Sequence, residues 1–277
     1  MYPAMLTRTI PKSGEQLPAI GLGTWKVFDV APSQANLAPL KDVLGVLFAS
    51  GGTVIDSSPM YGRAEAVCGA LLAEVKPRSA FIATKVWTEG RAQGIAQMRE
   101  SLKLFGVPRI DLMQVHNLVD WRTHLATLRE RKTQGLVRYA GITHYTPSAY
   151  AQLADILRRE QIDFVQLAYS IATREAEETL LPLCAERGVA VLVNRPFETG
   201  GLFRKTRGKE VPEWATEFGG THWSIFFLKY ILAHPGVTCA IPATANPAHM
   251  REIVAAGEGR LPSDAERARM RAFVGEL

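Results

Sequence analysis

The chain has 277 residues and a formal net charge of +5, with 47% hydrophobic and 21% charged residues. These are ordinary values for a globular protein that buries a large core. Basic and acidic residues are interspersed, so no run of like charge is long enough to act as a nucleic-acid-binding arm. We therefore expect a mixed, solvated surface and no nucleic-acid partner.

Three cysteines, Cys68, Cys184 and Cys239, occur without CxxC or Cys/His metal spacing. We expect free, buried thiols in a reducing compartment, with no disulfide framework and no metal site. The first residues lack the basic and apolar regions of a signal peptide, and no apolar stretch reaches the ~18 residues of a membrane span. The sequence thus predicts a cytoplasmic location and no membrane association.

Short apolar runs alternate with amphipathic stretches along the chain. Residues 8–17 are expected to form a hairpin around a turn that contains Gly14. Eight strands are predicted at 19–22, 53–55, 81–84, 112–115, 139–142, 164–167, 190–193 and 238–241. The helices that follow them are expected at about 33–49, 64–72, 125–132, 147–157, 176–185, 226–233 and 247–255, with one more through Met98, Leu102 and Leu104 and a last helix at 264–274. Ser33 and Ser263 are expected to cap the first and the last of these helices.

Eight strand–helix units in one chain favour a closed (β/α)8 barrel, because parallel strands need right-handed helical crossovers. We therefore predict the α/β class, with one TIM-barrel domain over residues 1–277 and a short N-terminal hairpin. The longest break in the alternation, residues 198–220, contains glycines and basic residues and is a candidate lid.

Four ionisable residues lie at or just after the carboxyl ends of predicted strands. Asp56, Lys85 and His116 each end an apolar run, and Tyr61 follows Asp56 closely. Carboxyl ends of barrel strands converge on one pocket. A phenol near pKa 10 is a poor acid at neutral pH, but an adjacent ammonium stabilises the phenolate. Any one of the four alone would be interpreted as structural; together they predict a tunable proton donor.

Two further motifs point to a ligand. Gly21-Leu-Gly-Thr-Trp-Lys26 lacks the third glycine of a dinucleotide fingerprint, but its glycines would let backbone approach a ligand closely, and Trp25 offers an apolar wall. Residues 241–249 lead into a helix N-terminus, where backbone amides, Thr244 and His249 would attract an anion. Phosphate sites after the last barrel strands are a recurring use of this architecture.

Nearly the whole chain resembles the aldo-keto reductase family, on the strength of four motifs. They are Gly-Leu-Gly-Thr-Trp at 21–25, Asp-Ser-Ser-Pro-Met-Tyr-Gly at 56–62, Ala-Thr-Lys at 83–85 and Val-His at 115–116. The resemblance implies reduction of carbonyl compounds by a nicotinamide cofactor bound across the barrel mouth. It also implies that Tyr61 is the general acid, that Lys85 lowers its pKa, that Asp56 pairs with Lys85, and that His116 orients the carbonyl.

The resemblance also implies cofactor contacts. Gln166 matches the family's carboxamide-binding glutamine, and Thr143-His144 replaces its usual Ser-Asn pair. Asn194-Arg-Pro-Phe197 replaces a segment in which a tyrosine commonly stacks on the nicotinamide. Arg195 and Phe197 are therefore candidates for this stacking. The competing interpretation of Asn194 is that it only caps the loop. The full set expected at the cofactor is Gly23, Thr24, Trp25, Thr143, His144, Gln166, Asn194, Arg195, Pro196, Phe197, Thr244, His249 and Glu252.

At the adenosine end, the family's Lys-Ser pair and following Arg correspond to Ala243-Thr244 and His249, and Glu252 matches an adenine-contacting glutamate. Thr244 and His249 would bind a phosphate more weakly than Lys and Arg do. We expect NADP(H) as the cofactor, with NAD(H) as the alternative.

Trp25, Trp87 and Trp121 are expected to line a pocket for small carbonyl substrates, with helix-start packing as the competing interpretation of Trp121. We expect no counterpart of the family's long C-terminal substrate loop, and hence an open pocket. No obligate protein partner is evident. Two rival hypotheses are a non-catalytic, cofactor-binding redox sensor and a Schiff-base lyase that uses Lys85 as nucleophile.

Overall fold

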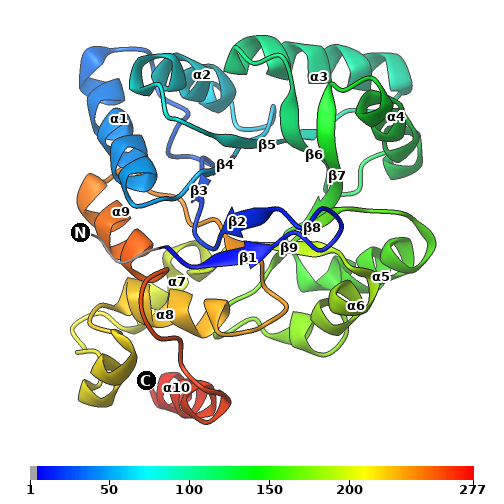
Figure 1. Cartoon of the computed structure of the whole chain (residues 1–277). Coiled ribbons are helices and arrows are strands. Elements are labelled where there is room, and N and C mark those ends of the chain that lie inside the picture. Colours follow the sequence, from blue (N-terminus) through cyan, green and yellow to red (C-terminus); the bar gives the residue numbers. More distant parts are fainter. Residues whose placement is uncertain (1–4) are drawn as a thin grey trace.

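A closed ring of parallel strands lies at the centre of the structure (Figure 1). The computed structural model describes residues 5–277. An isolated bridge between Ile20 and Ala240 closes the ring, and the Ala240 N–H donates to the Ala19 carbonyl at 2.9 Å. The (β/α)8 barrel predicted from the sequence is confirmed. Its strands, in chain order and in sheet order, are β3 (Leu22–Gly23), β4 (Val54–Asp56), β5 (Phe81–Val86), β6 (Ile110–His116), β7 (Val137–His144), β8 (Phe164–Ala168), β9 (Ala190–Asn194) and β10 (Cys239–Ala240).

Helices surround the barrel and connect its strands (Figure 1). Ser33 and Ser263 cap two of them as expected: Ser33 Oγ accepts the Asn36 N–H at 3.4 Å, and Ser263 forms a capping box with Glu266. The α-helices are α1 (Gln34–Ala49), α2 (Ala64–Val75), α3 (Arg91–Phe105), α4 (Trp121–Thr133), α5 (Tyr150–Arg159), α6 (Leu180–Arg187), α7 (Gly201–Lys205), α8 (Trp223–Leu232), α9 (Pro247–Ala255) and α10 (Asp264–Glu276). Short 3₁₀ helices are η1 (Pro147–Ala149), η2 (Glu175–Glu177), η3 (Glu198–Gly200) and η4 (Glu213–Phe218).

Some element boundaries differ from the sequence-based prediction. Helix α4 begins at Trp121 rather than at 125, directly after Asp120, which adopts a left-handed conformation with φ 42°. The segment 198–220 is not an irregular loop, because η3, α7 and η4 form within it. Leu202 and Phe218 anchor this segment in the core, with 3% and 2% exposure.

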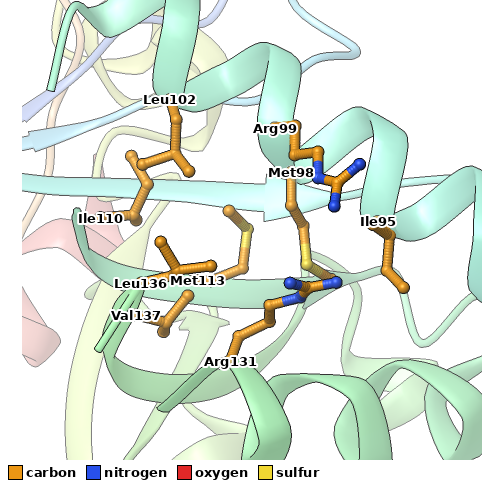
Figure 2. Close-up of a pocket in the computed structure, with 9 residues that line it drawn as sticks. All are labelled: Ile95, Met98, Arg99, Leu102, Ile110, Met113, Arg131, Leu136 and Val137. Carbon is orange, nitrogen blue, oxygen red and sulfur yellow. The ribbon is translucent and has the colours of Figure 1, made fainter. Parts of the chain in front are cut away.

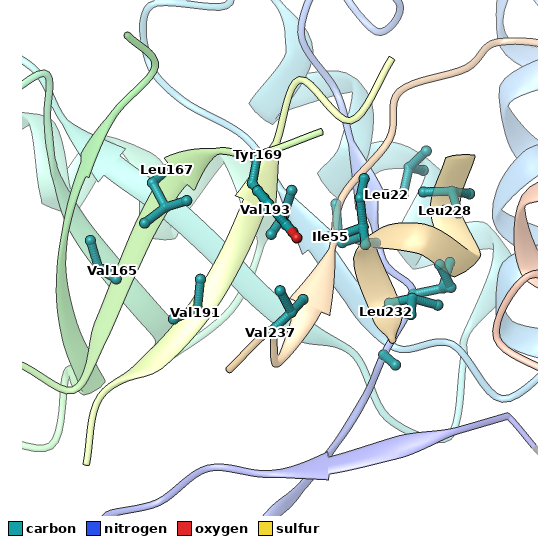
Figure 3. Close-up of a cluster of buried hydrophobic side chains, with 14 of the residues drawn as sticks. Leu22, Ile55, Val165, Leu167, Tyr169, Val191, Val193, Leu228, Leu232 and Val237 are labelled. Carbon is teal, nitrogen blue, oxygen red and sulfur yellow. The ribbon is translucent and has the colours of Figure 1, made fainter. Parts of the chain in front are cut away.

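Along each strand, successive side chains point in turn outward to the helices and inward to the barrel interior, as the two-residue period of a strand requires. Figure 3 shows part of the outward set, in which Val165, Leu167, Val191 and Val193 share one buried cluster with Leu228 of α8. The inward residues form a second cluster, made of Val54, Phe81, Ala83, Leu112, Tyr139, Phe164, Ala190, Leu192, Cys239 and Ile241 together with Ile10 and Leu17.

The N-terminal hairpin, dark blue in Figure 1, consists of β1 (Thr7–Thr9) and β2 (Gln16–Pro18). Ile10 and Leu17 are buried in the interior cluster, and the Tyr139 hydroxyl of β7 donates to Ser13 Oγ at 2.8 Å. The hairpin thus covers the end of the barrel at which the strands begin. A ligand site can therefore form at the opposite end of the barrel, where the strands end.

Gly23 has a structural role in closing the barrel. A Cβ atom at this position would lie 2.8 Å from the Ile241 carbonyl oxygen, closer than real Cβ contacts. The glycine therefore lets β3 approach the segment after β10, in addition to the approach to a ligand that its motif suggested.

A small gap between α3, α4 and β6 holds at most about one water molecule (Figure 2). Its volume is about 10 Å³, and Met98, Ile110, Met113 and Val137 are among the side chains around it. This gap is too small for a ligand. Within residues 5–277, no helix is both long enough and apolar enough to cross a membrane.

Candidate active site

A cavity of about 610 Å³ opens at the carboxyl ends of the barrel strands. This volume lies within the usual range for small-molecule sites. Many residues that the sequence singled out lie together in its wall: Gly23, Thr24, Trp25, Asp56, Tyr61, His116, Thr143, Gln166, Asn194, Arg195, Pro196 and Phe197.

Lys85 and Asp56 form a buried ion pair at the floor of the cavity. They are 0% and 3% exposed, and Lys85 Nζ donates to Asp56 Oδ2 at 2.6 Å and to the Ser57 carbonyl at 2.7 Å. Strand pairing brings them together: Asp56 lies opposite Ala83 of β5, and Lys85, two residues further along, points to the same interior face. Buried charges persist only when they are paired and hydrogen-bonded in this way.

The second carboxylate oxygen of Asp56 connects the ion pair to the rest of the barrel interior. Asp56 Oδ1 accepts hydrogen bonds from Gln114 Nε2 at 3.1 Å and from Gln166 Nε2 at 2.9 Å. Thr24 also contributes, because its hydroxyl donates to the Asp56 backbone carbonyl at 3.0 Å. Each carboxylate oxygen of Asp56 therefore has a hydrogen-bond partner, and these bonds fix the position of the carboxylate.

Tyr61 and His116 approach each other beside this pair. Their ring centroids are 5.8 Å apart and nearly perpendicular, and Lys85 Nζ lies 5.1 Å from the Tyr61 ring centroid. A turn fixes Tyr61, whose N–H donates to the Ser58 carbonyl at 2.9 Å, and Ser58 Oγ lies 2.9 Å from His116 Nδ1. A phenol, an ammonium and an imidazole thus converge on one side of the cavity.

The electrostatics of the site differ in part from the sequence-based expectation. Burial raises the pKa of the Tyr61 phenol, and the charge of Lys85 lowers it without cancelling the effect of burial. Burial would lower the pKa of Lys85, but Asp56 and Tyr61 outweigh burial and raise it, so Lys85 is an ammonium. Burial and the charge of Lys85 lower the pKa of His116 to about 3, so its imidazole is neutral at neutral pH.

A chain of amide groups continues from Asp56 along the cavity wall. Gln166 Oε1 accepts from Asn194 Nδ2 at 3.2 Å and from the Thr143 hydroxyl at 3.3 Å. Asn194 Oδ1 is buried and has no hydrogen-bond partner among residues 5–277. An unpaired buried acceptor is costly, so this wall suits a ligand that brings a donor, such as the carboxamide of a nicotinamide.

In the segment after β9, Arg195 places its planar guanidinium group at the cavity wall. The Arg195 guanidinium lies 4.9 Å from the Tyr145 ring centroid, and the His144 ring stacks on the same tyrosine at 5.4 Å. Arg195 and Thr199 adopt positive φ values near 52°, a conformation that a β-branched residue such as threonine rarely takes. Such strain is typical of ligand-binding segments.

The three tryptophans predicted for a substrate pocket occupy different places. Trp25 lines the cavity. Trp87 is not part of the cavity wall, but its ring centroid lies 6.4 Å from that of His116. Trp121 starts α4, packs partly buried against the core and has Arg122 over its ring at 4.3 Å, outside the cavity wall.

Of the residues predicted at the adenosine end, Ala243 lines the cavity, whereas Thr244, His249 and Glu252 lie around the start of α9, outside the cavity wall. Thr244 Oγ1 accepts the Asn246 N–H at 3.1 Å, and His249 is exposed. Glu252 accepts a hydrogen bond from Ser224 of α8 at 2.6 Å.

Several lining residues escaped the sequence analysis. Tyr145, Met60 and Asn117 follow strands that were recognised, and the place after a barrel strand was the available signal. Thr199, Gly200 and Phe203 belong to the segment that was predicted only as a lid. The remaining lining residues are Val27, which carried no signal, and Lys26, Ile241, Pro242 and Ala243, which belong to the two ligand motifs recognised at 21–26 and 241–249.

Comparison with known sequences gives a consistent result. A sequence model of the Aldo/keto reductase family matches residues 19–273. Methylglyoxal reductase YeaE of Escherichia coli is 27% identical over 270 residues, which cover 94% of this chain and 92% of that protein. An NADH-specific methylglyoxal reductase of Escherichia coli is 27% identical over 220 residues, which cover 67% of this chain and 65% of that protein.

Solved structures agree with the fold. A thermostable aldo-keto reductase in complex with the inhibitor epalrestat has a TM-score of 0.79 at 27% identity, with 97% of this chain and 100% of that chain covered. An aldo/keto reductase from Klebsiella pneumoniae in complex with NADP and acetate has a TM-score of 0.82 at 23% identity, with 97% and 95% covered, and this second likeness concerns the fold alone.

Proposed function

Because this chain belongs to the aldo/keto reductase family, we propose that it is an NAD(P)H-dependent reductase of aldehydes and ketones with Tyr61 as general acid. One observation carries the proposal: the buried Lys85–Asp56 pair lies beside the Tyr61 phenol and a neutral His116 in one cavity. A direct test is the consumption of NADPH, and separately of NADH, with short-chain, aromatic and dicarbonyl aldehydes.

Each residue of the set has a distinct role in this proposal. When bound, the nicotinamide cofactor supplies the hydride for the carbonyl carbon. Tyr61 holds the proton that the carbonyl oxygen takes up, and Lys85 favours its release by stabilising the phenolate. Asp56 keeps the ammonium in place. Neutral His116 orients the carbonyl without adding a charge to the site.

The surroundings of Lys85 weigh against the Schiff-base alternative. A nucleophilic lysine needs a free amine and access to its substrate. Lys85 is fully buried, charged and bonded to both Asp56 and Ser57. These contacts support an electrostatic role instead.

Replacing Lys85 with methionine tests that electrostatic role. The ammonium lowers the pKa of Tyr61, so its removal should raise this pKa, slow the reduction and move the alkaline limb of the pH profile of kcat/KM to higher pH. The measurement is kcat/KM for reduction across the alkaline range. Lys229→Met is the matched control, because Lys229 is also buried but donates to the Glu258 and Arg260 carbonyls. An unshifted limb in Lys85→Met would leave that residue only a structural role.

We further propose that Thr143, Gln166 and Asn194 hold the carboxamide of the cofactor. The unpaired Asn194 Oδ1 supports this assignment, since it can accept a hydrogen bond from the amide nitrogen. Arg195 and Phe197, both in the cavity wall, are the proposed stacking partners of the nicotinamide ring.

Cofactor preference should depend on the start of α9. Backbone amides and the helix dipole attract the cofactor's phosphate there, with help from Thr244 and His249. Because position 243 is alanine, Ala243→Lys should raise the NADPH/NADH ratio of kcat/KM, chiefly through affinity, and His249→Ala should lower it. The measurement is this ratio for each variant. If neither variant changes it, the phosphate is held elsewhere, with Arg204 and Lys205 of α7 as the next candidates.

The proposed substrates are small aldehydes and dicarbonyl compounds. Two relatives are methylglyoxal reductases, and the cavity combines polar groups at its floor with Trp25, Met60 and Phe203 in its wall. A panel of such carbonyls would rank them by kcat/KM.

A further inference from the structure

The large exposed hydrophobic side chains of the molecule gather around the candidate active site. In residues 5–277 they are Trp25, Met60, Trp87, Tyr145 and Phe203. All except Trp87 line the cavity, and Trp87 lies 6.4 Å from His116, ring centroid to ring centroid. Trp87 is 41% exposed, so packing alone holds its ring only in part. The position of its backbone therefore also determines where the ring can lie.

Side chains of neighbouring elements hold that backbone. Trp87 follows the last residue of β5, so its peptide groups lie beyond the strand pairing. Instead, the side chain of Gln97 of α3 bonds these peptide groups. The Trp87 N–H donates to Gln97 Oε1 at 2.5 Å, and Gln97 Nε2 donates to the Trp87 carbonyl at 3.2 Å. A side-chain amide offers the same donor and acceptor as a peptide group.

The residues after Trp87 are held as well. His124 Nε2 lies 2.6 Å from the Thr88 carbonyl, and the Gly90 N–H donates to Asp120 Oδ2 at 2.9 Å. These contacts fix the loop, but Gln97 alone among them bonds both backbone groups of Trp87. Gln97 itself is not part of the cavity wall.

We propose that Gln97 is a positioning residue that sets substrate selectivity through Trp87. The proposal rests on the carbonyl reductase function above. By holding Trp87 beside His116, Gln97 keeps a flat apolar ring at the margin of the cavity, near the reacting carbonyl. This ring favours substrates with a flat apolar body that reaches it, such as benzaldehyde, over small dicarbonyls such as methylglyoxal. Gln97 acts without touching the substrate.

The test compares Gln97→Met with Gln93→Met, a change of the same kind one turn earlier on α3. Gln97→Met should raise KM for benzaldehyde about tenfold, the size of one or two net hydrogen bonds, while KM for methylglyoxal and both kcat values stay nearly unchanged. Gln93→Met should behave like the wild type. In a Trp87→Ala background, Gln97→Met should have no further effect, because the route through Trp87 is already removed.

Two results would overturn the proposal: an unchanged benzaldehyde/methylglyoxal ratio of KM in Gln97→Met, or an equally large effect of this change in the Trp87→Ala background. If Gln97→Met does not fold, Gln97→Glu serves instead, since it keeps the acceptor and loses the donor, and it should raise the same ratio. Exchange of the Trp87 amide hydrogen, which donates to Gln97, is independent of catalysis and should quicken in Gln97→Met but not in Gln93→Met. A wild-type protein that reduces no carbonyl would refute the proposed function, and unchanged exchange would separately refute the role of Gln97.

Discussion

Replacing Tyr61 with phenylalanine is expected to lower kcat for carbonyl reduction by about 10²–10⁴-fold, the usual contribution of a positioned general acid. The change removes the only acidic proton of that side chain and keeps the ring that packs against His116 at 5.8 Å. Cofactor affinity should be retained, because the Thr143–Gln166–Asn194 wall is untouched. The measurements are single-turnover reduction and cofactor titration by fluorescence.

Tyr145→Phe is the control for this prediction. Tyr145 lines the same cavity but follows β7, and its ring stacks with His144. Its kcat should change little. An undiminished kcat in Tyr61→Phe would exclude the phenol as proton donor, whatever the effect on KM.

Replacing Asp56 with asparagine should destabilise the fold by about 3–5 kcal/mol, the typical cost of removing one partner of a buried ion pair. The variant leaves the Lys85 ammonium at 0% exposure without its carboxylate. It also disturbs the hydrogen bonds from Gln114 and Gln166 to Asp56 Oδ1. The free energy of unfolding, measured in urea, checks the expectation.

Asp155→Asn provides the matched comparison for Asp56→Asn. Asp155 pairs with Arg158 at 3.3 Å on the surface of α5, and both side chains are more than half exposed. Exposed pairs contribute only about 0–1 kcal/mol, so this variant should unfold almost like the wild type. Equal stability of the two variants would mean that the Lys85–Asp56 pair does not hold the barrel interior together.

The sequence predicted the candidate catalytic set because its signals are local. Asp56, Lys85 and His116 each end an apolar run. Because side chains alternate between the two faces of a strand, all three then point into the barrel. The barrel itself follows from the alternation of strands and helices. Both features can be predicted without knowing which distant segments of the chain lie in contact.

Other features depend on contacts between distant segments, and the local sequence carries at most a weak signal for them, such as the place of Tyr145 directly after a barrel strand. Tyr145 and Phe203 enter the cavity wall from segments far apart in the chain. The helix start at Trp121 depends on the left-handed Asp120, whose carboxylate accepts the Gly90 N–H. Gln97 looks like an ordinary residue of an amphipathic helix until α3 is placed beside Trp87. The net rise in the pKa of Tyr61 likewise depends on how deeply the phenol is buried.

The bridge between Ile20 and Ala240 also governs the order in which the protein can be completed. Its partners are far apart in the sequence, so the first barrel strand leaves the ribosome long before its second neighbour is made. Until then β3 has one open edge, which invites pairing with other chains. Contacts between distant segments also slow folding. During synthesis the barrel can close only after Ala240 has been made, and strands that pair before then form an open sheet that is vulnerable to aggregation.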